Sequence, residues 1–224
     1  MSNGTTVKKR NGRGVEPLNL EKIHVMCEEA CDGLAGVSAS QVEIQSGIQF
    51  YDGITTAEIQ EILIRSASDL IDLDHPNYQF VAARLLLFAL RKQLFGRMRE
   101  CPTVIDHVKK CVEKGVYDAE ILDLYSEEEY NRLQSFIDHS RDMIFTYAGL
   151  RQVVDKYLVQ DRSTGEVYET PQFMYMMISA TIFSKYPKET RLDYVRKYYE
   201  AISRHRINIP TPIMAGVRTP IRQF

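Results

Sequence analysis

The chain has 224 residues, enough for one large or two small domains with a hydrophobic core. Its 28 Lys and Arg stand against 30 Asp and Glu, and the net charge of −2 argues against a general nucleic-acid or membrane surface. Any anion site must therefore be local. The sequence has no apolar run of about 18 residues and no secretory signal pattern, so we expect a cytoplasmic protein.

The spacing of cysteine and histidine offers no metal-binding pattern. The four cysteines include no CxxC pair, and the five histidines show no HxH or HxxxH spacing. We therefore expect no metal site and reduced structural thiols. The residues concerned are Cys27, Cys31, Cys101 and Cys111, with His24, His75, His107, His139 and His205.

The first part of the chain predicts a small hairpin followed by four helices. Residues 5–19 place short β-compatible segments around a Gly-containing turn at 11–14. Asn19 can cap the first helix, and Thr55 with Glu58 matches a capping box before the third. The fourth is apolar nearly all round and should be buried. The predicted helices cover residues 20–34, 38–50 or 40–50, 57–73 and 77–96.

Beyond about Arg97 the pattern changes to shorter helices. Thr103 precedes one of them, and Ser126 with Glu129 forms a second capping box. A hairpin-like arm around a Ser-Thr-Gly turn and two long helices follow. The arm covers residues 156–169, and the long helices cover 172–183 and 188–206.

The last 15 residues contain three prolines and one glycine, which argues against regular helix. The run is nevertheless apolar, so its side chains need a partner surface, which we expect on sequence outside this chain. We therefore predict an extended C-terminal arm. The apolar residues that need burial are Ile207 and Ile209, just before these 15 residues, and Ile213, Met214, Val217 and Phe224 within them.

Phosphate-binding loops of the usual kinds are absent. No GxxxxGK[ST] pattern occurs, and Gly12-x-Gly14 lacks the third glycine of a dinucleotide fingerprint because residue 17 is proline. Four cations at the ends of separate elements could instead converge on one polyphosphate. The alternative, solvated side chains at these ends, stays open, and composition alone favours it. The cations are Lys9, Arg10, Lys22 and Lys92.

A second group of charges lies around His139. Asp138, Arg141 and Asp142 alternate in sign beside aromatic residues. The pattern predicts an ion-pair network that joins helices. Nothing in the spacing indicates a nucleophile paired with a base.

An ordered series of motifs resembles the large (α) subunit of class I ribonucleotide reductase over nearly the whole chain. "VKKRNG" with "LNLEKI", and then "DGITTAEIQEILIRSASDLI" and "YQFVAARLLLFALRK", are similar to the family's ATP-cone. "FIDHSRDMIFTYAGLRQVVDKYLVQDRSTGEVYETPQFMYM" is similar to its all-helical domain, and "IPTPIMAGVRTPIRQF" to the start of its catalytic barrel. The last differs from the family pattern at Ile209 and Ile221. The resemblance implies a mainly α fold, with an ATP-cone over residues 1–96 and an all-α domain over 97–224 that ends in the extended arm.

The resemblance also implies an effector site for ATP or dATP, with Mg²⁺ accompanying the nucleotide. The cations would neutralise phosphate oxygens, while Glu16 and Asn19 would bond ribose or base edges. Gln60 and Ala89 stand where related subunits often carry histidine, which puts strong inhibition by dATP in doubt. The implied nucleotide residues are Val7, Lys9, Arg10, Glu16, Asn19, Lys22, Thr56 and Lys92.

Thr211 matches a family position near the phosphate and sugar of a ribonucleoside diphosphate. By resemblance, the catalytic cysteines lie in a barrel outside this chain, so it holds no catalytic residue. The implied partners are the C-terminal part of the large subunit, a small subunit that generates a metal-supported tyrosyl radical, and further copies in an oligomer. If the chain is a whole natural product, it would be one piece of a split α subunit.

Two other functions stay open. One is a free-standing ATP-cone regulator, although that class pairs its cone with a zinc ribbon and this chain has no CxxC. The other is a structural helical module whose cone has decayed, for which Gln60 and Ala89 are the hints. The cations Lys9, Arg10, Lys22 and Lys92 argue against the second.

Overall fold

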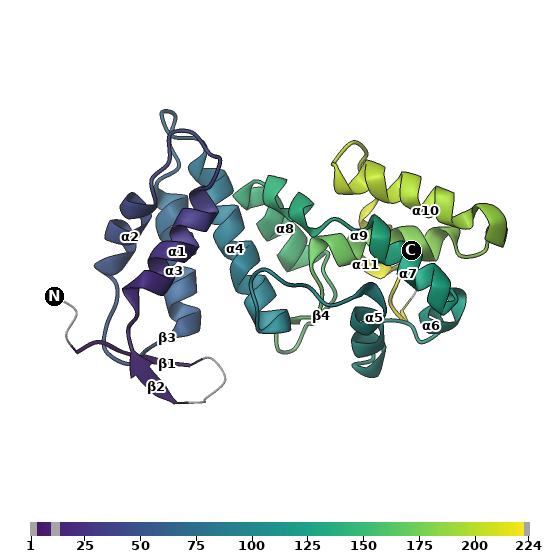
Figure 1. The fold of residues 1–224 in the computed structure, drawn as a ribbon, viewed down its shortest axis with the longest axis horizontal. Helices are drawn as coiled ribbons and strands as arrows, with labels where there is room; N and C mark the ends of the chain where they lie inside the picture. The colour runs from purple at the N-terminus through teal and green to yellow at the C-terminus, as the bar shows by residue number, and fades with distance from the viewer. Residues whose placement is uncertain (1–3, 10–13, 222–224) are drawn as a thin grey trace. The chain divides into compact units, whose positions relative to one another are not determined.

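The computed structural model describes residues 4–9 and 14–221 (Figure 1). The chain forms two compact units. The first consists of residues 1–90 and 143–151, and the second of residues 91–142 and 152–224. The expected domain ranges of 1–96 and 97–224 stay predictions.

A three-stranded sheet opens the first unit and lies at one end of α1 and α3 (Figure 1). Strand β1 (Thr6–Lys8) pairs antiparallel with β2 (Val15–Pro17), which confirms the predicted hairpin. Strand β3 (Ile54–Thr55) pairs with β1 in parallel, Val7 opposite Ile54, and both of these side chains are buried. The third strand was not predicted, because two residues are too short to show strand alternation.

Four helices follow in the first unit, as predicted. Local hydrogen bonds set the starts of the first and third: the Asn19 side chain accepts from the Lys22 backbone N at 3.0 Å, and Thr55 and Glu58 form the predicted capping box. The fourth helix is buried along much of its length and continues into the second unit. The helices are α1 (Leu20–Cys31), α2 (Ala39–Gly47), α3 (Thr56–Asp69) and α4 (Tyr78–Phe95).

His24 joins α1 to α2 through carboxylates on both helices. Its Nδ1 lies 2.8 Å from Glu43 Oε1, and its Nε2 lies 3.2 Å from Glu28 Oε1. The hydrogen bond with Glu43 and the charge of Glu28 raise the pKa of His24 above its ordinary value. The imidazolium is therefore favoured in the folded state.

The raised pKa of His24 predicts a pH dependence of stability. The contribution is fully present below the unfolded-state pKa of about 6.5 and is lost as pH rises through the higher folded-state pKa. Because His24 is solvent-accessible, we expect a small effect. Urea unfolding from about pH 5 to about pH 9 checks it: the wild-type chain should lose stability relative to His24→Asn as pH rises. A difference between the two that does not change with pH would contradict this.

The second unit is built around α9, whose residues from Pro171 to Ala180 are all buried. Helix α10 packs along α9 (Figure 1). Thr103 caps α5, and Ser126 with Glu129 forms the second predicted capping box, at α7. The helices are α5 (Val104–Glu113), α6 (Ile121–Leu124), α7 (Glu127–Phe136), α9 (Pro171–Phe183), α10 (Lys188–Ser203) and α11 (Thr211–Gly216).

The remaining elements connect these helices. A 3₁₀ helix, η1 (His139–Ile144), precedes α8 (Tyr147–Lys156). Strands β4 (Gln160–Asp161) and β5 (Glu166–Val167) pair antiparallel, which confirms the predicted hairpin-like arm. No helix in the part of the chain that the structure describes is long and apolar enough to cross a membrane.

The C-terminal segment corrects two expectations. Residues Thr211–Gly216 form helix α11, although the prolines and the glycine argue against regular helix. Pro212 stands in the first turn, where its missing N–H is not needed. The apolar side chains of Ile209, Met214 and Val217 are buried within this chain, so their partner surface is not wholly on other sequence. Ile207 is exposed, and Phe224 lies outside the described residues.

Candidate functional site

The first candidate site lies where β2 leads into α1. Glu16 Oε2 is 2.9 Å from Lys9 Nζ, and its Oε1 is 3.7 Å from Lys22 Nζ. The hydrogen bond from Lys9, together with the charge of Lys22, lowers the pKa of Glu16. One carboxylate thus draws two ammonium groups together from separate elements.

A surface cavity of about 490 Å³ adjoins these groups. Glu16, Asn19 and Lys22, three of the predicted nucleotide residues, line it. The other lining residues are Pro17, Leu18 and Leu20, which sequence reasoning missed. The signal that could have found them is their position beside the helix cap at Asn19. The cavity thus combines apolar side chains, a carboxylate and a cation, as the recognition of a base and a phosphate requires.

The remaining predicted nucleotide residues are distributed more widely. Val7 is the centre of β1 and pairs with Glu16, so the sheet fixes both. Thr56 is the first residue of α3 and follows Thr55, which pairs with Lys8 of β1. Lys92 lies in the last turn of α4, in the second unit, so its convergence with the others stays a prediction. Arg10 lies outside the described residues.

Thr211 lines a second cavity, of about 580 Å³, within the second unit. Its Oγ1 is 3.4 Å from the Tyr157 hydroxyl, and this hydrogen bond lowers the pKa of Tyr157. Lys156 and Arg162 are the charged side chains among the described residues that line the cavity. Both are cationic, which suits an anionic ligand. Sequence reasoning missed them, because one isolated cation at the end of α8 and one in the turn between β4 and β5 carry no distinctive pattern.

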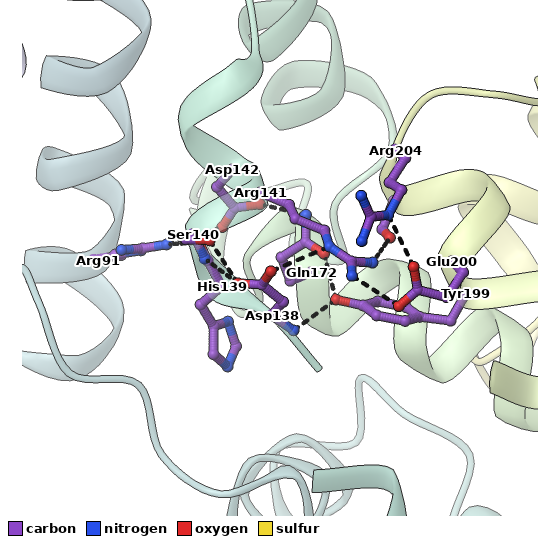
Figure 2. Close-up of polar contacts among 11 residues, drawn as sticks. Arg91, Asp138, His139, Ser140, Arg141, Asp142, Gln172, Tyr199, Glu200 and Arg204 are labelled. Atoms are coloured by element: carbon purple, nitrogen blue, oxygen red, sulfur yellow. Dashed lines mark hydrogen bonds and ion pairs between the residues drawn. The ribbon is translucent and has the colours of Figure 1, made fainter. Parts of the chain in front are cut away.

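The charges around His139 form the predicted ion-pair network (Figure 2). Arg141 contacts Asp138 at 3.3 Å and Glu200 of α10 at 2.7 Å. Asp142 is fully buried and receives hydrogen bonds from Arg91 at 3.2 Å and Gln172 at 2.9 Å. Burial raises the pKa of Asp142 to about 6, against the opposing charge of Arg91. The network joins α4, η1, α9 and α10, so its role is structural.

Gln60 and Ala89, the two departures from the family pattern, lie in helices of the first unit. Gln60 is buried in α3, and Ala89 lies in α4. In the described ranges, 4–9 and 14–221, no three His, Cys, Asp or Glu side chains gather as ligands for a metal ion.

Comparison with known proteins matches each of two parts of the chain to a family model. Residues 5–93 match the family model for the ATP cone domain. Residues 143–222 match the model for the ribonucleotide reductase all-alpha domain.

The relatives give the same assignment. Over all 224 residues the chain is 54% identical to ribonucleoside-diphosphate reductase 1 subunit alpha of Salmonella typhimurium and 53% identical to that of Escherichia coli. The α subunit of Enterobacteria phage T4 is 49% identical over 191 residues, 84% of this chain and 25% of the phage protein. The chain spans 29% of the length of the two bacterial relatives. It therefore belongs to the ribonucleoside-diphosphate reductase α-subunit family, as an ATP-cone followed by the all-α domain.

Proposed function

We propose that the chain is the nucleotide-sensing N-terminal portion of a ribonucleoside-diphosphate reductase, and that ATP or dATP binds at the cavity beside Glu16. The observation that carries the proposal is the pairing of Lys9 and Lys22 around Glu16 at this cavity, within the residues matched by the ATP-cone model. A triphosphate that displaces the Glu16 carboxylate would bind to the ammonium groups of Lys9 and Lys22, which are already close together.

Each residue of the site has a physical role in this proposal. Lys9 and Lys22, with Arg10 and Lys92, neutralise phosphate oxygens, and Mg²⁺ accompanies the nucleotide. Asn19 and the released Glu16 carboxylate bond the ribose or the base, while Val7 and Thr56 complete the wall. Gln60 and Ala89 lead us to propose that dATP inhibits weakly.

The second cavity supplies one wall of the active site in this proposal. Thr211 contacts the phosphate and sugar of a ribonucleoside diphosphate, and the cationic lining of the cavity supports an anionic substrate. Reduction requires the C-terminal part of the α subunit and the radical-generating small subunit, in an oligomer. The four cysteine thiols are free, which agrees with a reducing compartment, and we propose the cytoplasm.

The match to the all-α domain favours this function over a free-standing cone regulator, which has no need of that domain. The reductase proposal is tested by mixing the chain with the C-terminal part, the small subunit, ATP and a ribonucleoside diphosphate. We expect deoxyribonucleotide in the full mixture and none when any component is left out. A full mixture without product, formed from a chain that still binds ATP, would leave a nucleotide-binding regulator as the better description.

Nucleotide binding is tested on the chain alone with Lys22→Met. The variant should weaken ATP binding about ten- to hundredfold, because a hydrogen bond to a charged group contributes about 1.5–3 kcal/mol. Isothermal titration calorimetry measures the effect. Lys185→Met, which removes an exposed lysine in the second unit, is the matched control and should bind as the wild type does. Equal affinities for Lys22→Met and the control would place the nucleotide elsewhere.

A further inference from the structure

A fully buried ion pair lies behind the cavity that contains Thr211. The side chains of Glu169 and Arg218 are both 0% exposed. Arg218 donates from Nε to Glu169 Oε2 at 2.9 Å and from Nη2 to Glu169 Oε1. Glu169 also accepts from the Tyr117 hydroxyl at 2.5 Å and from the Val159 backbone N at 2.7 Å. The carboxylate is therefore bonded on both oxygens, as a buried charge requires.

The remaining donors of Arg218 bind main-chain carbonyls on two walls of the cavity. Nη1 donates to the Met214 carbonyl at 2.6 Å, inside α11, the helix that begins at Thr211. Nη2 donates to the Tyr157 carbonyl at 3.0 Å. One guanidinium thus ties α11 to the residue whose hydroxyl lies 3.4 Å from Thr211 Oγ1.

Helix α11 depends on tertiary contacts for its stability. The helix has six residues and no side-chain N-cap, and a helix this short is not stable by itself. The backbone N of Asp118 donates to the Arg218 carbonyl at 3.0 Å, which fixes the segment just after α11 to the loop before α6. Arg218 therefore holds the end of α11 through both its side chain and its main chain.

We infer that Arg218, held by Glu169, is a positioning residue that fixes Thr211 and Tyr157 as the substrate-facing walls of this cavity. The inference rests on the proposed function, since it takes the ligand to be a ribonucleoside diphosphate. Arg218 is buried and does not touch the ligand. It acts through the two carbonyls, and so through the main chain that carries Tyr157 and Thr211.

The test uses Arg218→Lys in the assembled reductase, with KM and kcat measured for a ribonucleoside diphosphate. Lysine keeps the charge beside Glu169, but one ammonium group cannot reproduce the planar fork that reaches both carbonyls. We expect KM to rise about tenfold or more, with kcat changed less than about twofold. Arg97→Lys, at an exposed pair with Glu100, is the matched control and should change neither constant.

A double variant separates positioning from general damage. If Arg218 acts by placing Thr211, adding Arg218→Lys to Thr211→Val should raise KM less than about twofold further. The same rise in both backgrounds, or no rise in either, would overturn the inference.

Amide hydrogen exchange on the 224-residue chain gives a readout that needs no activity. Arg218→Lys should speed exchange in residues 211–217 and leave residues 20–69 unchanged. Unchanged exchange at α11 would overturn the inference. If the wild-type assembly makes no deoxyribonucleotide, the proposed function fails, and exchange still decides whether Arg218 holds α11.

Discussion

Arg218→Met is expected to lower the free energy of unfolding of the second unit by about 3–5 kcal/mol, because it leaves a buried carboxylate without its charged partner. Glu169 would lose the partner that contacts both of its oxygens, and water cannot reach it. The carbonyls of Met214 and Tyr157 would each lose a donor as well. Urea unfolding of the chain followed by circular dichroism measures the loss, since both units are largely helical.

The matched control removes both charges. Glu169→Leu with Arg218→Met leaves no unpaired ion, so it should recover a large part of the stability that Arg218→Met loses. Tyr117→Phe removes one hydrogen bond to Glu169 and leaves the ion pair intact, so its cost should be about 1–3 kcal/mol. If the double variant were less stable than the single one, packing of the two side chains, and not charge pairing, would account for the effect.

Phe173→Ala is expected to cost the same unit about 3–5 kcal/mol, because it removes the central ring of a buried cluster. The Phe173 ring stacks on His107 with centroids 3.8 Å apart and an interplanar angle of 11°. Phe95 and His139 contact it edge-on, at 6.0 Å and 4.8 Å between centroids. Burial lowers the pKa of His107 to about 3, so the stacked ring is neutral at pH 7. Removing the phenyl group therefore opens a cavity beside a neutral imidazole.

Phe173→Leu tests whether the loss comes from the cavity or from the ring contacts. Leucine fills much of the space, so its cost should be clearly smaller than that of alanine. The measurement is again urea unfolding, with Tyr194→Ala, an exposed aromatic of α10, as the surface control. A Phe173→Ala variant as stable as this control would show that the cluster relaxes to fill the gap.

Local hydrogen-bond chemistry explains which elements could be predicted from sequence. Asn19, the Thr55 and Glu58 box, and the Ser126 and Glu129 box each mark a helix start within four residues, and all three form as predicted. Strand β3 was missed because two residues show no alternation, and helix α11 was missed because the prolines argued against helix. The first exists through its pairing with β1, and the second is bound by Arg218.

The residues of the first candidate site could be predicted from sequence, whereas several residues of the second could not. Glu16, Asn19 and Lys22 are close in sequence, and the structure brings them to one cavity. Lys156 ends α8 and Arg162 lies in the turn between β4 and β5, so they join Thr211 at one cavity only through long-range folding that no spacing encodes. Resemblance to a family supplied Thr211, but it did not supply the buried pair behind it.

Glu16 already places an anion at the cavity where we propose that the nucleotide binds. Its carboxylate already forms an ion pair with Lys9 and lies close to the ammonium group of Lys22. A nucleotide that bound there would exchange one anion for another, and the free energy released would be the difference between two sets of ion pairs. Because the contacts of Glu16 with both lysines would be given up, this exchange would keep the affinity moderate. A sensor of a metabolite present at high concentration needs such an affinity, because a tighter site would stay full and report nothing.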